Sequence, residues 1–308
     1  MSNDLPTRRR FLATSAIALS SAAIASAQPA TTQSQSMLTR KIPSSGESIP
    51  VVGLGTWNAL NPEKLDDASL KPLEEVVRIF YDAGGRVIDT APSYGSAEEV
   101  TGILTDRMEL SDKVFIATKV LERGAEAGLG SFNRSLQRLK RQKIELMQVH
   151  NFTDWKTVLP LLREWKQKGT FRYIGVTHYQ DHAHDDLEAI IKADKPDFLQ
   201  LNYSIAERAA EKRLLPVARD NGTATLINRP FASGGLIRSV SAKPLPDFVK
   251  PFASTWAEAL LKFVLAEEAV TCIIPATRNP KHMQENVRAG FGRLPTKDER
   301  EKLAAAIV

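Results

Sequence analysis

Short apolar runs alternate with amphipathic, helix-length stretches along most of this chain. The runs are rich in Val and Ile and have the length of buried strands, whereas the stretches between them repeat apolar residues at helical spacing. Because strands that alternate with helices usually pair in parallel, the pattern predicts a parallel sheet covered by helices. The runs lie at 51–54, 86–88, 114–118, 144–149, 171–176, 198–201, 223–227 and 270–274, and the helical stretches at 73–83, 98–107, 129–141, 155–168, 187–193, 212–221 and 256–267.

The number of apolar runs favours one closed α/β architecture, the (β/α)8 TIM barrel, because eight runs are what such a barrel needs. An open, doubly wound sheet is the alternative, and it is expected to carry Gly-x-Gly-x-x-Gly after its first strand. Gly-Leu-Gly-Thr-Trp at 53–57 is too short a match, so we predict the barrel. Residues 38–41 and 47–49, joined by Pro-Ser-Ser-Gly at 43–46, predict an N-terminal β-hairpin.

The N-terminus has the pattern of a twin-arginine (Tat) signal peptide. Thr-Arg-Arg-Arg-Phe-Leu at 7–12 precedes a weakly apolar run at 13–25, which is shorter than the roughly 20 residues that span a bilayer. Ala25-Ser26-Ala27 supplies the small-x-small cleavage pattern. We predict a Tat signal peptide at 1–27, cleaved after Ala27, a linker at 28–37 and the barrel at 38–308. An ordinary secretory signal or a basic tail is the alternative.

Charge and cysteine content fit an exported protein that crosses the membrane already folded. Removing residues 1–27 lowers the formal net charge from +5 to +3, because three arginines and one aspartate leave. This charge is too mild, and too evenly spread, to predict a nucleic-acid partner. The single cysteine, Cys272, lies in an apolar run and is expected to be a buried thiol. A chain without disulfides suits folding in the cytosol and passage through the Tat machinery to the periplasm, without stable membrane insertion.

Four chemically reactive side chains fall where strands of the predicted barrel end. Asp89, Lys119 and His150 follow successive apolar runs about thirty residues apart, and Tyr94 comes five residues after Asp89. In a barrel, the C-terminal strand ends converge on one face. Taken singly, Lys119 suits a rim salt bridge, Asp89 a helix N-cap and His150 a structural polar group. Together at one rim, they favour a catalytic site.

The chain resembles the aldo-keto reductases through motifs that occur in order over residues 38–308. These motifs are GLGTW (53–57), DTAPSYG (89–95), ATK (117–119), LMQVHN (146–151), GVTHY (175–179), QLNYS (200–204) and IIPATRNPKHMQENV (273–287). The resemblance implies reduction of an aldehyde or ketone by a hydride from NAD(P)H. It also implies that Tyr94 donates the proton while His150 orients the carbonyl oxygen.

The ordinary phenol pKa of about 10 makes tyrosine a poor acid near neutrality. A neighbouring ammonium favours the phenolate and lowers that pKa. We therefore expect Lys119 to tune Tyr94 and Asp89 to anchor Lys119.

The same resemblance implies a nicotinamide cofactor across the barrel mouth, with Gln200 at its carboxamide. The sequence departs from the family at His178, where many relatives carry Asn, and at Asn228, where relatives often place an aromatic ring. Ala276 and His282 replace the usual Lys and Arg of the adenosine-phosphate site. Because Arg278 and Lys281 can supply cations there, NADP(H) is favoured over NAD(H). The expected cofactor contacts are Gly55, Thr56, Thr177, His178, Gln200, Asn228, Ser233, Gly235, Leu236, Thr277, Arg278, His282, Glu285 and Asn286.

Trp57 and Phe152 are expected to wall an apolar substrate pocket. The chain ends soon after its last helix, so the long C-terminal loop of many relatives is expected to be absent and the site to be open and permissive.

Two other functions remain open at this point. One is a redox sensor or scaffold that binds the cofactor without turnover. The other is a metal-dependent hydrolase built on the cluster His178, His182, His184, Asp185 and Asp186. Helix capping explains that cluster better, so no metal is predicted. For an exported reductase, we expect the cofactor to bind before export and to stay bound.

Overall fold

The computed structural model describes residues 36–307. The predicted signal peptide, its cleavage site and most of the linker lie outside the described residues.

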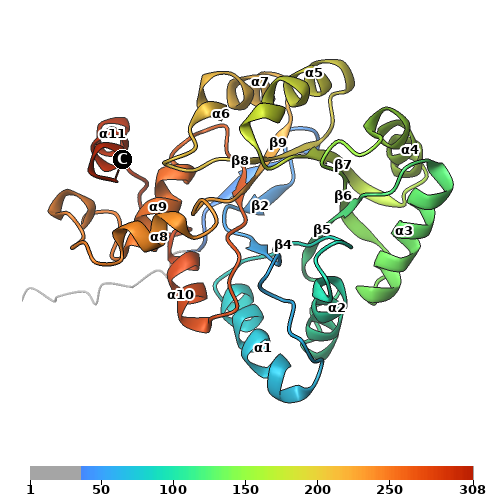
Figure 1. Ribbon diagram of the computed structural model, residues 1–308, viewed down its shortest axis with the longest axis horizontal. Coiled ribbons are helices and arrows are strands. Elements are labelled where there is room, and N and C mark those ends of the chain that lie inside the picture. The colour runs from blue at the N-terminus through green and yellow to red at the C-terminus, as the bar shows by residue number, and fades with distance from the viewer. Residues whose placement is uncertain (1–35, 308) are drawn as a thin grey trace, which may run out of the picture. The chain divides into compact units, whose positions relative to one another are not determined.

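Eight parallel strands form the barrel, in the order β10-β9-β8-β7-β6-β5-β4-β3 (Figure 1). Bridges between Val52 and Ile273 and between Gly55 and Ala276 join its first and last strands. The predicted (β/α)8 barrel is therefore confirmed. The strands are β3 (Leu54–Gly55), β4 (Val87–Asp89), β5 (Phe115–Val120), β6 (Ile144–His150), β7 (Phe171–Thr177), β8 (Phe198–Asn202), β9 (Ala224–Asn228) and β10 (Cys272–Ile273).

Helices surround the barrel and connect its strands (Figure 1). The first helix begins at Asp67, earlier than the apolar pattern predicts, because the Asp66 side chain caps it by accepting a hydrogen bond from the Ser69 N–H at 2.9 Å. The helices are α1 (Asp67–Asp82), α2 (Ala97–Arg107), α3 (Ala125–Arg138), α4 (Trp155–Gln167), α5 (His184–Asp194), α6 (Ala209–Lys212), α7 (Leu214–Asp220), α8 (Gly235–Val240), α9 (Trp256–Leu265), α10 (Pro280–Arg288) and α11 (Lys297–Ile307), with 3-10 turns η1 (Asp181–Ala183) and η2 (Asp247–Val249).

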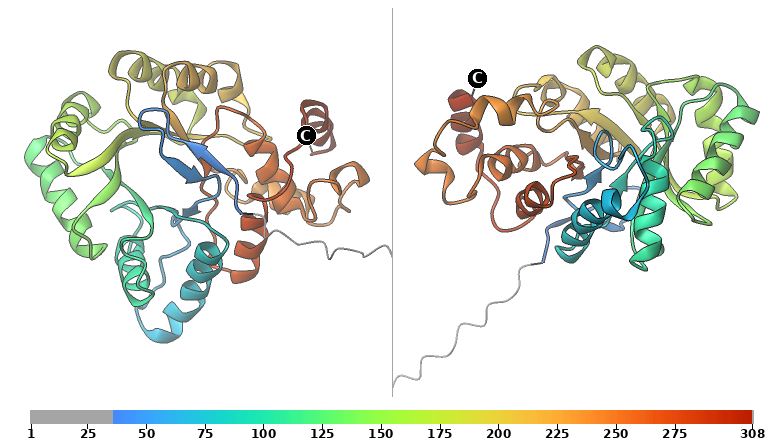
Figure 2. Two further views of the ribbon diagram at one scale, coloured as in Figure 1. Left: turned by 180° about the vertical axis from the view of Figure 1, so that it is seen from behind. Right: turned by 60° about the horizontal axis from the view of Figure 1, so that its bottom comes forward.

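The predicted hairpin covers the end of the barrel at which the strands begin. Strands β1 (Thr39–Lys41) and β2 (Ser48–Pro50) pair antiparallel, and Figure 2 (left) shows them lying across the barrel. Ile42 and Ile49 of this segment join a buried cluster of strand side chains that also contains Phe198 and Cys272. The hairpin therefore seals this end of the barrel with apolar contacts, and Cys272 is a buried thiol, as predicted.

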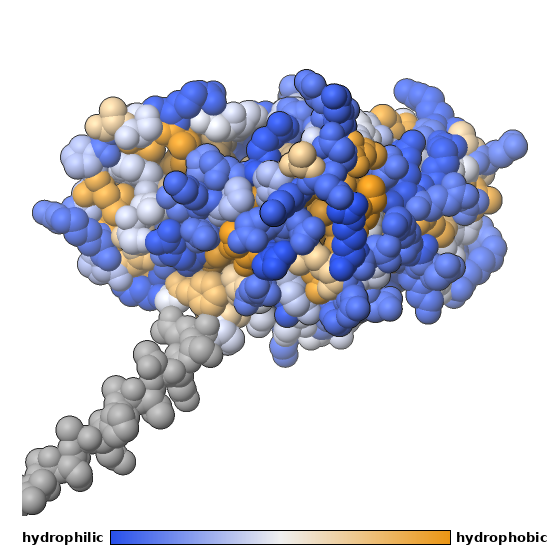
Figure 3. Space-filling view, turned by 90° about the horizontal axis from the view of Figure 1, so that it is seen from below, coloured by the Kyte–Doolittle hydropathy of each residue, from blue (hydrophilic) through white to orange (hydrophobic). Residues whose placement is uncertain are grey.

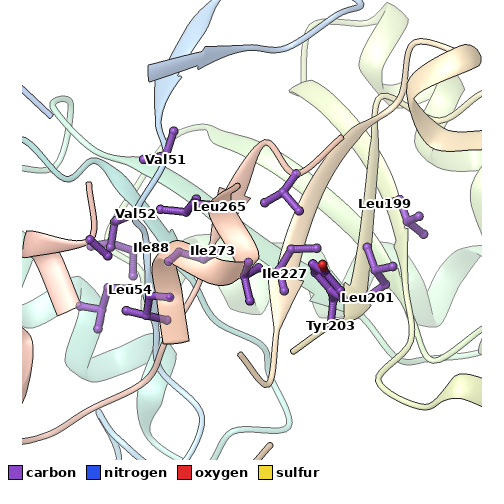
Figure 4. Close-up of a cluster of buried hydrophobic side chains, with 14 of the residues drawn as sticks. Val51, Val52, Leu54, Ile88, Leu199, Leu201, Tyr203, Ile227, Leu265 and Ile273 are labelled. Atoms are coloured by element: carbon purple, nitrogen blue, oxygen red, sulfur yellow. The ribbon is translucent and has the colours of Figure 1, made fainter. Parts of the chain in front are cut away.

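A larger core lies between the sheet and its helices. Val52, Ile88, Ile227 and Ile273 are fully buried there (Figure 4). Each such side chain contributes roughly 1.5–3 kcal/mol through removal of its apolar surface from water. The face shown in Figure 3 is mostly hydrophilic, with apolar side chains in separate groups. Within residues 36–307, no helix is both long enough and apolar enough to span a bilayer.

Candidate active site

Three of the predicted catalytic residues lie on adjacent strands at one end of the barrel. Asp89 is the last residue of β4 and His150 the last of β6, and Lys119 lies one residue before the end of β5. These strands pair in register, with Asp89 opposite Ala117 and Lys119 opposite Gln148. The parallel pairing therefore brings three distant segments of the sequence to one rim.

Tyr94 reaches the same rim from the loop that follows β4. Its neighbour Gly95 has a φ of 63°, and a Cβ added there would lie 2.6 Å from Oδ1 of Asn61. That oxygen accepts hydrogen bonds from the Ser96 backbone N–H at 3.3 Å and from the Ser96 hydroxyl at 3.1 Å. Glycine therefore allows this loop to pack against the loop after β3, which fixes the position of Tyr94.

Lys119 and Asp89 form a buried ion pair. The Lys119 Nζ donates to Asp89 Oδ1 at 3.0 Å, to Oδ2 at 2.8 Å and to the carbonyl of Thr90 at 2.8 Å. Burial alone lowers the pKa of Lys119, but Asp89 and Tyr94 together raise it above its ordinary value. Lys119 is therefore a cation at neutral pH.

Tyr94 lies next to this cation, with its ring centroid 4.9 Å from the Lys119 Nζ. Burial raises the pKa of the phenol, Lys119 lowers it and Asp89 raises it, and the net shift is upward. Lys119 acts in the expected direction, but the expected net lowering is wrong. The reason is that burial and the partner carboxylate outweigh the ammonium. Tyr94 is therefore a neutral phenol at neutral pH, with its proton in place.

His150 completes the group as a neutral imidazole. Its ring centroid lies 6.0 Å from that of Tyr94, in an edge-to-face arrangement. Burial, followed by the charge of Lys119 and by His178, lowers the pKa of His150 to about 3. Its Nδ1 is buried and has no hydrogen-bond partner among the described residues. The ring can therefore exchange a hydrogen bond with a ligand without carrying charge.

A pocket of about 950 Å³ opens over Asp89, Tyr94 and His150. Lys119 lies beneath it. Trp57 stands at the rim with 53% of its surface exposed. The other predicted residues that line the pocket are Gly55, Thr56, Thr177, Gln200, Asn228, Ser233, Thr277 and Arg278.

Gly234 and Ala276, next to predicted cofactor contacts, also line the pocket. Sequence reasoning missed further lining residues, which are Asn58, Ala59, Ser93, Asn151, Tyr179, Arg229, Pro230, Phe231, Ile274 and Pro275. Most of them follow a strand directly, so their place after strand ends was the available signal.

Phe152 and His178, which were predicted to contact the substrate or the cofactor, are not among the residues that line the pocket. The Phe152 ring stacks on the His178 ring at 4.9 Å, and the His178 ring stacks on Tyr179 at 5.4 Å. Asn151 and Phe152 have φ values of 49° and 59°. This left-handed turn accompanies the stack, in which Tyr179 is the ring that lines the pocket.

The predicted cofactor contacts after β9 and β10 are only partly brought to the pocket. Ser233 and Gly234 line it, whereas Gly235 and Leu236 form the start of α8. Arg278 lines the pocket and donates to the carbonyl of Asn58 at 2.8 Å. Three predicted residues of α10, which begins at Pro280, are not among the lining residues; these are His282, Glu285 and Asn286.

Some of the histidines and aspartates after β7 take part in a local hydrogen-bond network. His184 Nε2 lies 3.2 Å from Oδ1 of Asn202, and the Asn202 Nδ2 donates to Asp181 at 2.6 Å. Within residues 36–307, no group of three His, Cys, Asp or Glu side chains could hold a metal ion.

The fold and the site together define a class of protein. It is a (β/α)8 barrel with an N-terminal hairpin, and a buried lysine–aspartate pair lies beside a tyrosine and a histidine at its C-terminal mouth. A model of the Aldo/keto reductase family matches residues 51–304. The chain belongs to this family.

Individual relatives are distant. The chain is 30% identical over 198 residues to Aldo-keto reductase YhdN of Bacillus subtilis (strain 168), and the match covers 59% of each protein. It is 27% identical over 238 residues to the NADH-specific methylglyoxal reductase of Escherichia coli (strain K12), covering 67% of this chain and 72% of that protein. An aldo-keto reductase from Klebsiella pneumoniae, crystallised with NADPH, shares the fold with a TM-score of 0.74 at 24% identity, covering 88% of this chain and 96% of that one.

Proposed function

We propose that this protein is an NAD(P)H-dependent reductase of aldehydes or ketones. The observation that carries the proposal is the buried Lys119–Asp89 pair beside Tyr94 at the floor of the pocket. A buried ion pair is costly to desolvate, so its presence beneath a pocket favours a functional role.

The residues divide the work of carbonyl reduction among them. When bound, NAD(P)H supplies the hydride. Tyr94 is the acid, because it holds its proton at neutral pH and lies at the pocket floor. Lys119 stabilises the phenolate that Tyr94 leaves behind, and Asp89 fixes Lys119 in place. Neutral His150 orients the carbonyl oxygen through a hydrogen bond.

The pocket carries unpartnered polar atoms that suit a nicotinamide nucleotide. Thr56 Oγ1 and Asn228 Oδ1 are buried, belong to lining residues and have no partner among the described residues. Buried polar atoms normally have a partner, so a polar ligand would satisfy both. Gln200 would hold the carboxamide, and Ser233, which lines the pocket, would approach the pyrophosphate.

NADP(H) is favoured over NAD(H) because Arg278 and Lys281 stand at the start of α10. Both side chains are exposed, and the helix N-terminus adds partial positive charge that favours a phosphate. The related E. coli enzyme is named NADH-specific, whereas the Klebsiella enzyme was crystallised with NADPH. Dissociation constants for both cofactors, measured by fluorescence titration, decide the preference. Tighter binding of NADH would overturn it.

A broad range of substrates is our proposal for this site. Trp57 offers an exposed aromatic face at the rim, and Tyr179 lines the pocket with 42% of its surface exposed. An open, aromatic rim binds apolar carbonyl compounds without demanding one shape. Activity confined to a single small aldehyde would contradict this.

The experiment that tests the function uses the purified protein loaded with NADPH. Nicotinamide absorbance is followed while a panel of aldehydes and ketones is added. We expect oxidation of the cofactor with several of them. Stable cofactor absorbance with the whole panel would instead support the redox sensor or scaffold, which binds the cofactor without turnover.

A further inference from the structure

Two glutamine side chains contact the Asp89 carboxylate in addition to Lys119. Gln200 of β8 donates from Nε2 to Asp89 Oδ1 at 2.6 Å. Gln148 of β6 donates from Nε2 to the same oxygen at 3.4 Å. All four side chains are buried. Asp89 therefore receives hydrogen bonds from β5, β6 and β8, and is far more constrained than a simple ion pair requires.

The orientation of the Gln200 amide follows from its neighbours. An ionised carboxylate only accepts hydrogen bonds, so the amide must present its NH2 group to Asp89. On the other side, the Thr177 hydroxyl donates to Gln200 Oε1 at 3.2 Å. Turning the amide over would set its oxygen against the Asp89 carboxylate and lose that hydrogen bond, so Asp89 fixes the orientation and the Thr177 hydroxyl follows it as a donor. The chain Thr177–Gln200–Asp89–Lys119 thus has a defined direction of donation from Thr177 to Asp89.

Gln200 differs from Gln148 in one respect. Gln200 lines the pocket, and Gln148 does not. After its bonds to Asp89 and Thr177, the Gln200 amide retains one N–H and one lone pair. That remainder is complementary to a primary carboxamide, which offers one carbonyl oxygen and an NH2 group.

We propose that Gln200 is a positioning residue for proton transfer, which acts on Tyr94 through Asp89 and Lys119. The proposal rests on the proposed function, in which Tyr94 is the acid. Gln200 thereby links the cofactor pocket to the Asp89–Lys119 ion pair, which lies beside the Tyr94 phenol. Thr177 supports this role because its hydroxyl holds the Gln200 amide in place. Gln148 supports it by donating a second amide hydrogen bond to Asp89.

The physical reason lies in how much of the Lys119 charge reaches the phenol. An N–H donated to Asp89 Oδ1 offsets part of the carboxylate charge, so less of the Lys119 field is cancelled at Tyr94. The titratable groups around Tyr94 are Asp89 from β4, Lys119 from β5 and His150 from β6. Losing the amide donor therefore leaves the carboxylate more negative and the phenolate less stable.

The test compares Gln200→Met, Gln148→Met and Thr177→Val in the protein without cofactor. Ionisation of Tyr94 is followed by ultraviolet difference titration, with the spectrum of Tyr94→Phe subtracted in each background. We expect Gln200→Met to raise the Tyr94 pKa by about one, because a hydrogen bond to the charged form is lost. Gln148→Met and Thr177→Val should also raise the Tyr94 pKa, but by less. The Gln148 hydrogen bond to Asp89 is longer, and Thr177 contacts Gln200 rather than Asp89.

A cofactor-binding titration separates this role from simple cofactor contact. Gln148→Met should leave the NADPH dissociation constant unchanged, whereas Gln200→Met should increase it. If Gln200→Met weakens cofactor binding while Tyr94 titrates as in the parent, the positioning role is wrong. Thr177→Val carries the same test should Gln200→Met not fold. The Tyr94 titration does not require turnover. A parent protein that reduces no carbonyl compound would contradict the proposed function, but the effect of Gln200→Met on the Tyr94 pKa could still be measured.

Discussion

At the scale of single residues, the Lys119 charge is stabilised first by Asp89 and then by Tyr94. The substitution Lys119→Met leaves the buried Asp89 carboxylate without its cation, which should lower the free energy of unfolding by about 3–5 kcal/mol. Carbonyl reduction should fall by at least about 100-fold, because the phenolate loses its stabilising charge. Urea unfolding and steady-state kinetics measure the two effects.

The double variant Asp89→Asn/Lys119→Met separates stability from catalysis. It removes both charges, so much of the lost stability should return while the activity stays low. Recovery of activity along with stability would mean that Lys119 serves only the fold.

His150 gives a pH dependence of stability whose sign follows from its lowered pKa. The folded protein resists protonation until a pH of about 3, whereas an unfolded histidine protonates near its ordinary pKa of about 6.5. Protonation therefore favours unfolding, and between these pH values this residue lowers the free energy of unfolding by about 1.4 kcal/mol per pH unit of acidification. As the pH is lowered from 6, the free energy of unfolding should fall less steeply for His150→Gln than for the parent, as measured by urea unfolding at each pH. The exposed His282→Gln variant is the control, and an equal effect of both would contradict the assignment.

At the scale of elements, the loop after β4 depends on Gly95. A Gly95→Ala substitution meets a left-handed φ and a 2.6 Å contact with Asn61, and should cost roughly 1–3 kcal/mol and displace Tyr94. Gly46→Ala is the matched control, because Gly46 also has a positive φ of 76° but nothing within 4 Å of an added Cβ. We expect Gly95→Ala to reduce activity and Gly46→Ala to leave it intact. If Gly95→Ala and Gly46→Ala reduced activity equally, the loss would come from the strained backbone and not from displacement of the loop that carries Tyr94.

The elements also mark how far sequence reasoning reaches. Apolar periodicity predicts the strands, the hairpin and the rim position of Asp89, Lys119 and His150, because those depend on local pattern and parallel pairing. The stacking of Phe152 on His178 depends on a left-handed turn that no residue type there demands. The net pKa of Tyr94 depends on how deeply the folded chain buries it. Neither the ring stacking nor the net shift of the Tyr94 pKa can therefore be predicted from the local sequence pattern.

At the scale of the whole molecule, the proposed periplasmic location is tested through the arginine pair. A Tat signal is read by its receptor through those arginines, so Arg8→Lys/Arg9→Lys should leave the protein in the cytosol. Cell fractionation with antibody detection gives the distribution. Continued export of this variant would favour an ordinary secretory signal.

The same location predicts that the cofactor travels with the folded protein. The periplasmic form should be purified with nicotinamide nucleotide bound and should release it slowly. Exported protein that is empty and exchanges NADPH rapidly would argue against retention.

The central claim is that the Tyr94 phenol gives its proton to the substrate oxygen. Tyr94→Phe keeps the ring and removes only the hydroxyl, so cofactor binding should stay near the parental value while turnover falls by at least about 100-fold. Single-turnover oxidation of bound NADPH by an aldehyde, measured beside the cofactor dissociation constant, gives both numbers. Parental rates in Tyr94→Phe would show that the proton comes from another group.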